Sequence, residues 1–323
     1  MTSARFLNRR TALIAGAGCL LAACGARPSP AVSGTAVPPP APESVRPPEP
    51  APLLADPPPY VLRTGEVEPA CKAAAVAYVS TALTVGTASA RTSPGQRLQQ
   101  AGHDPSAASA LAPLLPPSGA STVEVVYPQY GGLVTGRNAC VMLVAEQSTV
   151  TAPGAPVARR TLTLDVRLVA DRGAWRVIEV IPAVDPVPAS ALSASVLAVL
   201  ADDRIVLPDA ARADLRGGTI SDAVAESLLA AADRWQVHVL VLTGGHPPNV
   251  WNTNRVSNHT GGRAVDIWAL DDIPVIDGDR CPWQELARVG AASGAREIGT
   301  PYSVGVRGGF SDRVHQDHIH LGF

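Results

Sequence analysis

A proline-rich segment near the N-terminus limits where this chain can fold. Proline, alanine and serine dominate from Arg27 to Tyr60, and 13 of the chain's 31 prolines lie between Pro28 and Pro59. Proline lacks a backbone N–H and fixes φ, so this composition builds no packed core and favours extended polyproline II structure. We predict that residues 24–59 form an extended linker of about 3.1 Å per residue. The folded part of the chain should therefore start near Tyr60.

The remaining length and the charge balance narrow the function classes. The chain has 323 residues and 46% hydrophobic content, enough for two ordinary domains. A net charge of -2 gives no electrostatic basis for binding nucleic acid, so we expect no nucleic-acid partner. Of the 26 basic residues only Lys72 is lysine, a bias that we attribute to a GC-rich coding sequence.

The N-terminus is typical of an export signal. Arg5, Arg9 and Arg10 precede the apolar run TALIAGAGCLLAA, which is too short for a stable membrane span but suits a signal peptide over residues 1–23. The run ends on small residues before Cys24, and this ending resembles the bacterial lipobox, in which the cysteine receives a lipid. We predict an exported lipoprotein, anchored by Cys24 to the outer face of the cytoplasmic membrane. An ordinary cleaved signal is the alternative, and the choice between general and twin-arginine export stays open.

Cysteine usage agrees with export. Behind the signal and the lipidated residue only Cys71, Cys140 and Cys281 remain, so one internal disulfide can form. We predict a Cys71–Cys140 disulfide because both residues fall in the first folded region. Cys281 then stays free, as a small buried hydrophobic residue.

Residues 60–184 have the pattern of a small α+β domain. An alanine-rich helix is predicted over 66–83, strands over 121–127 and 138–146, and a hairpin over 161–180, where apolar and polar residues alternate. A helix packed on a curved antiparallel sheet resembles, by pattern alone, the nuclear transport factor 2-like fold. We see no ionisable cluster in this region that would demand catalysis. The expected role is a spacer or a contact for a protein partner in the envelope.

Residues 185–323 contain the candidate metal-binding and catalytic residues. A helix from Ser221 to Trp235 is predicted to precede a buried strand, VHVLVL, and five of the chain's seven histidines lie between His246 and His320. The segment SNHTGGRAVDIW places His259 in a glycine-rich turn and Asp266 on the strand that follows. The C-terminal segment HIHLGF places two histidines on one strand face.

A zinc site explains this spacing. Pairing the strands GRAVDIW and HIHLGF would bring His259, Asp266 and either His318 or His320 to one point. Catalytic zinc takes about three protein ligands and keeps one position open. Two imidazoles and a carboxylate also suit other divalent metals.

At these residues the chain resembles a known family. Ser257-x-His259-x-x-Gly262-x-Ala264-x-Asp266 matches the signature S-x-H-x-x-G-x-A-x-D of bacterial zinc D-Ala-D-Ala carboxypeptidases and L-Ala-D-Glu endopeptidases, whose fold is shared by lysostaphin and the hedgehog signalling domain. The resemblance covers about residues 190–323. It implies an antiparallel sheet with helices and Zn²⁺ held by His259, Asp266 and His320.

The resemblance leaves the general base open. By analogy with the carboxypeptidases, Asp317 would accept a proton from water, but on a regular strand it would face away from His320, so it must precede the strand or sit at a bulge. In the lysostaphin pattern His318 takes the catalytic role instead. We therefore predict both as catalytic residues, with Asp317 slightly ahead, and His315 as an exposed rim residue.

The chain departs from the family just before the metal turn. Many members carry S-G-Y-R before the metal turn, where this chain has Thr243-Gly244-Gly245-His246. His246, Arg255 and Ser257 are the expected substrate-binding residues, and Glu297 is a further candidate for the pocket wall.

These observations predict two α+β domains and a cell-envelope zinc metallopeptidase that hydrolyses peptidoglycan stem peptides. Whether it would be a carboxypeptidase or an endopeptidase stays open. The alternative is a catalytically inactive zinc-binding domain, which binds cell-wall peptides or a protein partner.

Overall fold

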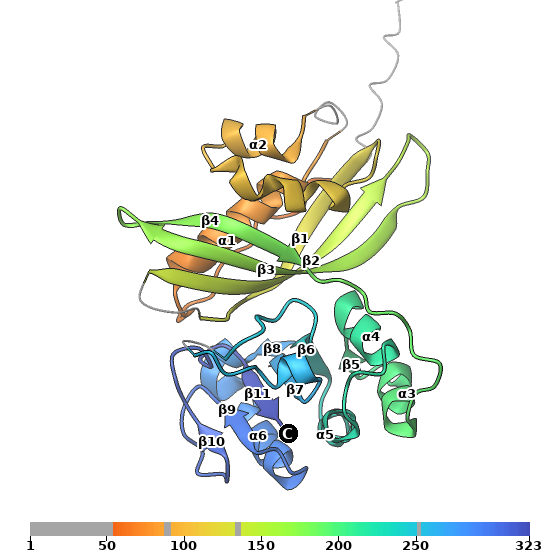
Figure 1. The fold of residues 1–323 in the computed structure, drawn as a ribbon, viewed down its shortest axis with the longest axis vertical. Coiled ribbons are helices and arrows are strands. Elements are labelled where there is room, and N and C mark those ends of the chain that lie inside the picture. The colour runs from red at the N-terminus through yellow and green to blue at the C-terminus, as the bar shows by residue number, and fades with distance from the viewer. Residues whose placement is uncertain (1–53, 87–91, 133–136, 251–252) are drawn as a thin grey trace, which may run out of the picture. The chain divides into compact units, whose positions relative to one another are not determined.

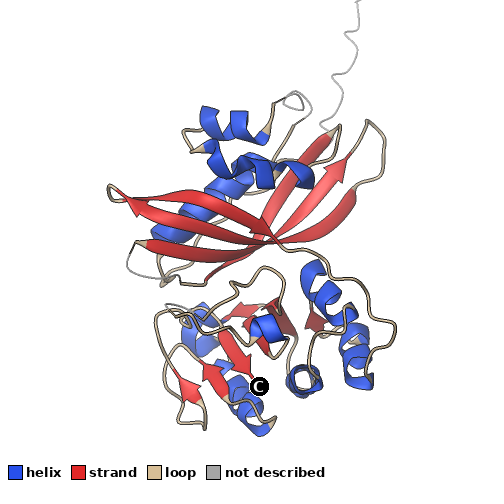
Figure 2. Ribbon diagram, in the orientation of Figure 1, coloured by secondary structure: helices blue, strands red, loops and turns tan. Residues whose placement is uncertain are grey.

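The computed structural model describes residues 54–86, 92–132, 137–250 and 253–323. The predicted signal peptide, Cys24 and most of the linker 24–59 lie outside the described residues. The fold is α+β, as predicted, with helices and two sheets (Figure 2). No described helix is long and apolar enough to cross a membrane.

Residues 54–184, the N-terminal region, contain a helix-covered antiparallel sheet. Its four strands follow one another in the order β1-β2-β3-β4, and α1 lies across one face (Figure 1). The predicted helix and strands therefore form, while the likeness to nuclear transport factor 2 stays a prediction. The elements are α1 (Pro69–Leu83), α2 (Pro94–Gln100), the 3-10 helices η2 (Pro105–Ala110) and η3 (Ala112–Leu114), β1 (Ala120–Tyr130), β2 (Asn138–Val150), β3 (Ala158–Asp171) and β4 (Ala174–Pro182).

Residues 185–323, the C-terminal region, contain a seven-stranded sheet in the order β10-β9-β11-β7-β6-β5, with β8 paired to β7. The elements are α3 (Ala194–Ala201), β5 (Ile205–Val206), α4 (Asp209–Arg216), α5 (Asp222–Ala232), β6 (Val237–Val241), η4 (His259–Gly261), β7 (Ala264–Leu270), β8 (Ile273–Pro274), η5 (Val275–Arg280), α6 (Trp283–Ala292), β9 (Glu297–Gly299), β10 (Gly309–Phe310) and β11 (Ile319–Gly322).

This second sheet is mixed, where we predicted an antiparallel one. Its centre is antiparallel, because β7 pairs with both β6 and β11. The strands β5 and β6 are parallel, and so are β9 and β10. Parallel neighbours need a crossover connection, which α4 and α5 supply between β5 and β6.

Each region has a core of its own, and a third cluster of buried residues lies between them. The described residues from 54 onward belong to one compact unit, and the domain boundary at residue 184 stays a prediction. The sheet face of the N-terminal region that is turned away from α1 packs against β6 and β7. The buried residues of this contact are Tyr127, Cys140, Met142, Val144, Leu240 and Val241, with Val126 and Trp268 packed against them.

The predicted disulfide is wrong, because Cys71 and Cys140 are both free and buried. Side chains alternate along β2, and Val141 packs with Cys71 in the core beneath α1. Cys140 faces the opposite side of the sheet, where its thiol donates to Asp165 Oδ1 at 2.9 Å. The strand therefore lies between the two sulfur atoms.

Candidate functional site

Two neighbouring strands bring the predicted metal ligands together. In the antiparallel pair β7–β11, His320 lies directly opposite Asp266. His259 opens the short helix η4 in the turn before β7, and this turn ends at Gly262 with φ +65°. A Cβ on Gly262 would lie 1.9 Å from the carbonyl oxygen of Thr219, so glycine is required here.

The three ligand atoms form a compact triangle. His259 Nε2 lies 3.2 Å from Asp266 Oδ1 and 3.1 Å from His320 Nδ1, and His320 Nδ1 lies 3.0 Å from Asp266 Oδ1. Ligand atoms about 2.0–2.1 Å from a tetrahedral zinc ion would be about 3.3 Å apart. The donor set and its spacing therefore fit a metal ion.

Hydrogen bonding prepares His259 for this role. Its Nδ1 donates to the carbonyl of Leu242, which fixes the tautomer and leaves the Nε2 lone pair free. Ser257 Oγ accepts the backbone N–H of His259 at 3.3 Å, and Thr243 Oγ1 donates to the His259 carbonyl at 2.9 Å. Ser257 thus supports the turn as well as lining the pocket.

His246 belongs to the same cluster. Ligand atoms of His246, His259 and Asp266 all lie within 4.8 Å of one another, so this group could hold a metal ion. The His246 ring stacks on the His259 ring, with 3.9 Å between centroids and 12° between planes. A lone pair in a parallel ring points beside an ion held by His259, so we take His320 as the better third ligand and His246 as a wall above the site.

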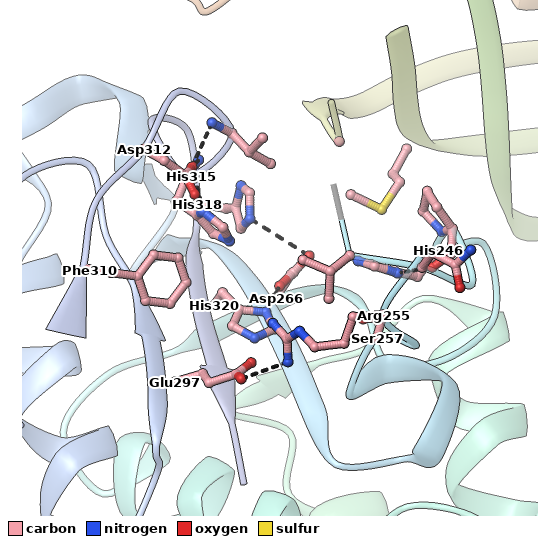
Figure 3. Close-up of a pocket in the computed structure, with 16 residues that line it drawn as sticks. His246, Arg255, Ser257, Asp266, Glu297, Phe310, Asp312, His315, His318 and His320 are labelled. Atoms are coloured by element: carbon pink, nitrogen blue, oxygen red, sulfur yellow. Dashed lines mark hydrogen bonds and ion pairs between the residues drawn. The ribbon is translucent and has the colours of Figure 1, made fainter. Parts of the chain in front are cut away.

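A cavity of about 300 Å³ opens on this centre. In Figure 3, Asp266 lies between His318 on one side and His246 on the other. The predicted residues Arg255, Ser257 and Glu297 all line the cavity. The full lining is Gly131, Met142, His246, Pro247, Asn249, Val250, Arg255, Ser257, Asp266, Glu297, Phe310, Asp312, Val314, His315, His318 and His320.

Arg255 is committed to a partner at the rim. Its Nη1 lies 2.9 Å from Glu297 Oε1, and the side chain is half exposed. Asn258 Nδ2 donates to the other oxygen of Glu297 at 3.0 Å. Arg255 can reach a substrate from this position only by sharing or leaving Glu297.

Asp317 lies behind His318 and outside the cavity lining. It precedes β11, as the strand geometry required, and is fully buried. Its Oδ1 accepts from His318 Nδ1 at 2.7 Å, while its Oδ2 accepts from Lys72 Nζ at 2.5 Å and from the Tyr130 N–H at 2.9 Å. Both oxygens are occupied, so His318, whose Nε2 lies 3.7 Å from Asp266 Oδ2, is the better placed proton acceptor.

A second aspartate–histidine pair was not anticipated. His315, expected at an exposed rim, is half-buried and lines the cavity beside His318, with 5.0 Å between ring centroids. Its Nδ1 lies 2.8 Å from Asp312 Oδ1. It packs over Gly299, where a Cβ would lie 2.4 Å from the imidazole.

The buried charges differ in their preferred protonation. Burial opposes ionisation of Asp266, but the neighbouring His259 and His318 hold its pKa well below the ordinary value. Burial lowers the pKa of His320 to about 4, which leaves a neutral imidazole with a free lone pair near pH 7. Burial also acts to lower the pKa of His318, yet the carboxylates of Asp266 and Asp317 raise it.

Sequence reasoning missed the contribution of the N-terminal region. Gly131 and Met142 line the cavity, and Gln129 Nε2 donates to Asp266 Oδ2 at 2.6 Å. Lys72 is fully buried beside Asp317. The one available signal was the presence of a single lysine, which we attributed to coding bias.

Comparison of the chain with protein-family models, with curated proteins and with solved structures found no match. The proposals below therefore depend on the site and on the sequence motif.

Proposed function

We propose that this protein is a zinc-dependent peptidase that hydrolyses a peptide bond in peptidoglycan stem peptides. The observation that carries the proposal is the convergence of His259 Nε2, Asp266 Oδ1 and His320 Nδ1 at 3.0–3.2 Å beside a cavity that also contains His318. The Ser257–Asp266 motif supports the same chemistry.

The residues divide the chemical work. His259, Asp266 and His320 would hold the ion, which when bound supplies Lewis-acid polarisation of a carbonyl and activation of water. His318 takes the proton from the attacking water and passes it to the leaving amine. Asp317 accepts the Nδ1–H of His318, which keeps its Nε2 lone pair toward the cavity.

The cavity walls suit a short peptide. Phe310, Val250 and Met142 supply apolar surface, and Arg255 supplies hydrogen-bond donors at the rim. His246 donates its Nδ1–H to the Pro247 carbonyl at 2.6 Å, so its Nε2 can only accept. Arg255 could pair with a carboxylate of the stem peptide by leaving Glu297.

The proposed location places this chemistry near its polymer. A lipid on Cys24 and the linker 24–59 would hold the folded part outside the cytoplasmic membrane. Cell fractionation tests this: the unaltered protein should sediment with membranes, and Cys24→Ala should not. A membrane-bound Cys24→Ala variant would contradict the lipid anchor.

The function is tested on residues 54–323 without a C-terminal tag. About one zinc per chain by elemental analysis is expected, with new peptide fragments by mass spectrometry after incubation with purified peptidoglycan. His318→Ala is the matched control, which should keep zinc and release fragments about 10²- to 10⁴-fold more slowly. Bound zinc without products from the unaltered protein would instead support the inactive binding domain, and no bound metal would reject the proposal.

A further inference from the structure

The chain's one lysine lies at the back of the candidate site, in a helix of the other region. Lys72 is in α1 and its side chain is fully buried. Its Nζ contacts Asp317 Oδ2 at 2.5 Å and pairs with Glu66 Oε2, and it lies 4.9 Å from the centre of the Tyr127 ring. The segment around Lys72 thus reaches a residue 245 positions further along the chain.

The strand β1 reaches the site at two further points. Gln129 Nε2 donates to Asp266 Oδ2 at 2.6 Å, and the Tyr130 N–H donates to Asp317 Oδ2 at 2.9 Å. A carboxylate only accepts, so the amide nitrogen of Gln129 must face Asp266. Gln129 is fully buried, and its Oε1 has no protein partner.

Burying Lys72 and its ion pairs contributes little to stability, so a positioning role is the better explanation for these contacts. A buried ammonium loses several kcal/mol of hydration, which its ion pairs only partly offset. Here the contacts converge on the two carboxylates of the site. Asp266 directs its Oδ1 to the ligand triangle, and Asp317 directs its Oδ1 to His318.

We propose that the N-terminal region is an integral part of the active site, with Gln129 positioning the metal ligand Asp266 and Lys72 positioning His318 through Asp317. Gln129 holds the Asp266 carboxylate so that Oδ1 faces His259 and His320. Lys72 and the Tyr130 amide hold Asp317 so that His318 faces the cavity. This inference rests on the proposed metal site, but its first readout is metal affinity, which requires no substrate.

The Gln129 contact is tested by zinc affinity, measured by competition with a chelator on residues 54–323. Gln129→Leu should bind zinc about 10- to 100-fold more weakly, as is typical when a partner of a metal ligand is removed. Gln147→Leu is the matched control, because Gln147 is a fully buried glutamine of the neighbouring strand that donates to Leu114 and Ser121, outside the cavity lining. It should bind zinc like the unaltered protein. Equal affinity in Gln129→Leu and the control would overturn the Gln129 assignment.

The Lys72 contact can be tested without any substitution. Because the chain has one lysine, a sample labelled with ¹⁵N at the lysine Nζ gives one side-chain signal. Zinc should shift this signal in the unaltered protein and leave it unchanged in His259→Ala. A signal that stays in place while zinc binds would show that Lys72 does not sense the site.

Lys72→Met gives the catalytic readout. It should lower kcat with KM nearly unchanged, because it disturbs the orientation of His318 and leaves the other residues of the cavity lining in place. Zinc affinity should stay within about threefold of that of the unaltered protein. An unchanged kcat would reduce Lys72 to an interface contact. If the unaltered protein binds no zinc, both the proposed function and this inference are rejected. If it binds zinc and neither the Gln129 nor the Lys72 substitution has the expected effect, this inference alone is rejected.

Discussion

His259 Nε2 and His320 Nδ1 lie 3.1 Å apart, although 61 positions separate the two residues in the chain. The strand β11 brings them together, because it lies between β7 and β9 and sets His320 opposite Asp266. His320, the proposed third metal ligand, is thus held by strand pairing on both sides. Deleting that strand would disrupt the sheet as well as the site, so single substitutions are the sharper tests.

The third metal ligand is distinguished by comparing two histidines. His320→Ala should lose bound zinc, because it removes one corner of the ligand triangle. His246→Phe should keep zinc, because a phenyl ring can still stack on His259 but offers no lone pair. Elemental analysis of both purified variants decides this, and the reverse pattern would make His246 the ligand.

The roles of Asp317 and His318 are separated by a double-mutant cycle. If His318 moves the proton, His318→Ala should lower kcat about 10²- to 10⁴-fold while zinc stays bound. Asp317→Asn should lower kcat by no more than that, because Asp317 acts through the His318 ring. The double variant should be no less active than His318→Ala, since groups that act as a unit are not additive. A further loss in the double variant would give Asp317 a role of its own.

The turn that presents His259 should tolerate no side chain at Gly262. Gly262→Ala combines a left-handed backbone, costing about 1–2 kcal/mol, with a clash against the Thr219 carbonyl that adds about 1–3 kcal/mol. Gly294→Ala is the matched control, since Gly294 also has positive φ but open space around it. Urea unfolding should show a clearly larger loss for Gly262→Ala. Equal losses would mean that the turn can move away from Thr219.

Local patterns were sufficient to predict the elements that carry the candidate metal ligands. The alternating residues of 161–180 predicted the hairpin β3–β4, and the spacing of His259 and Asp266 predicted a turn followed by a strand. The pairing of β7 with β11 was also predictable, because it brings Asp266 and His320, the candidate ligands on the two strands, next to each other.

Contacts between the two regions have no such pattern. Lys72 meets Asp317 and Gln129 meets Asp266 through tertiary packing, over separations of 245 and 137 residues. The sheet face on which Cys140 lies could not be predicted either. Residues 139–145 of β2 are all buried, on both faces of the sheet, so burial does not alternate along the strand. The presence of one lysine, Lys72, in a predicted helix suggests a special role, but no sequence periodicity indicates which residue it pairs with.

The final prediction concerns the aromatic contact next to the Gln129–Asp266 bond. The Tyr127 ring stacks on Trp268, with 4.9 Å between centroids and 13° between planes. Tyr127 is two positions before Gln129, and Trp268 is two positions after Asp266, so each pair shares one strand face. Trp268→Ala should cost about 3 kcal/mol and also weaken zinc binding, because the loosened strands no longer hold Gln129 against Asp266.

Trp235→Ala is the matched control, because Trp235 packs against the core of the C-terminal region and not against the cluster between the two regions. It should lower the free energy of unfolding without changing zinc affinity. Calorimetry and chelator competition on both variants measure the two quantities. Unaltered zinc affinity in Trp268→Ala would show that the packing of Tyr127 on Trp268 does not influence the metal site. The Gln129–Asp266 hydrogen bond would then form without that packing.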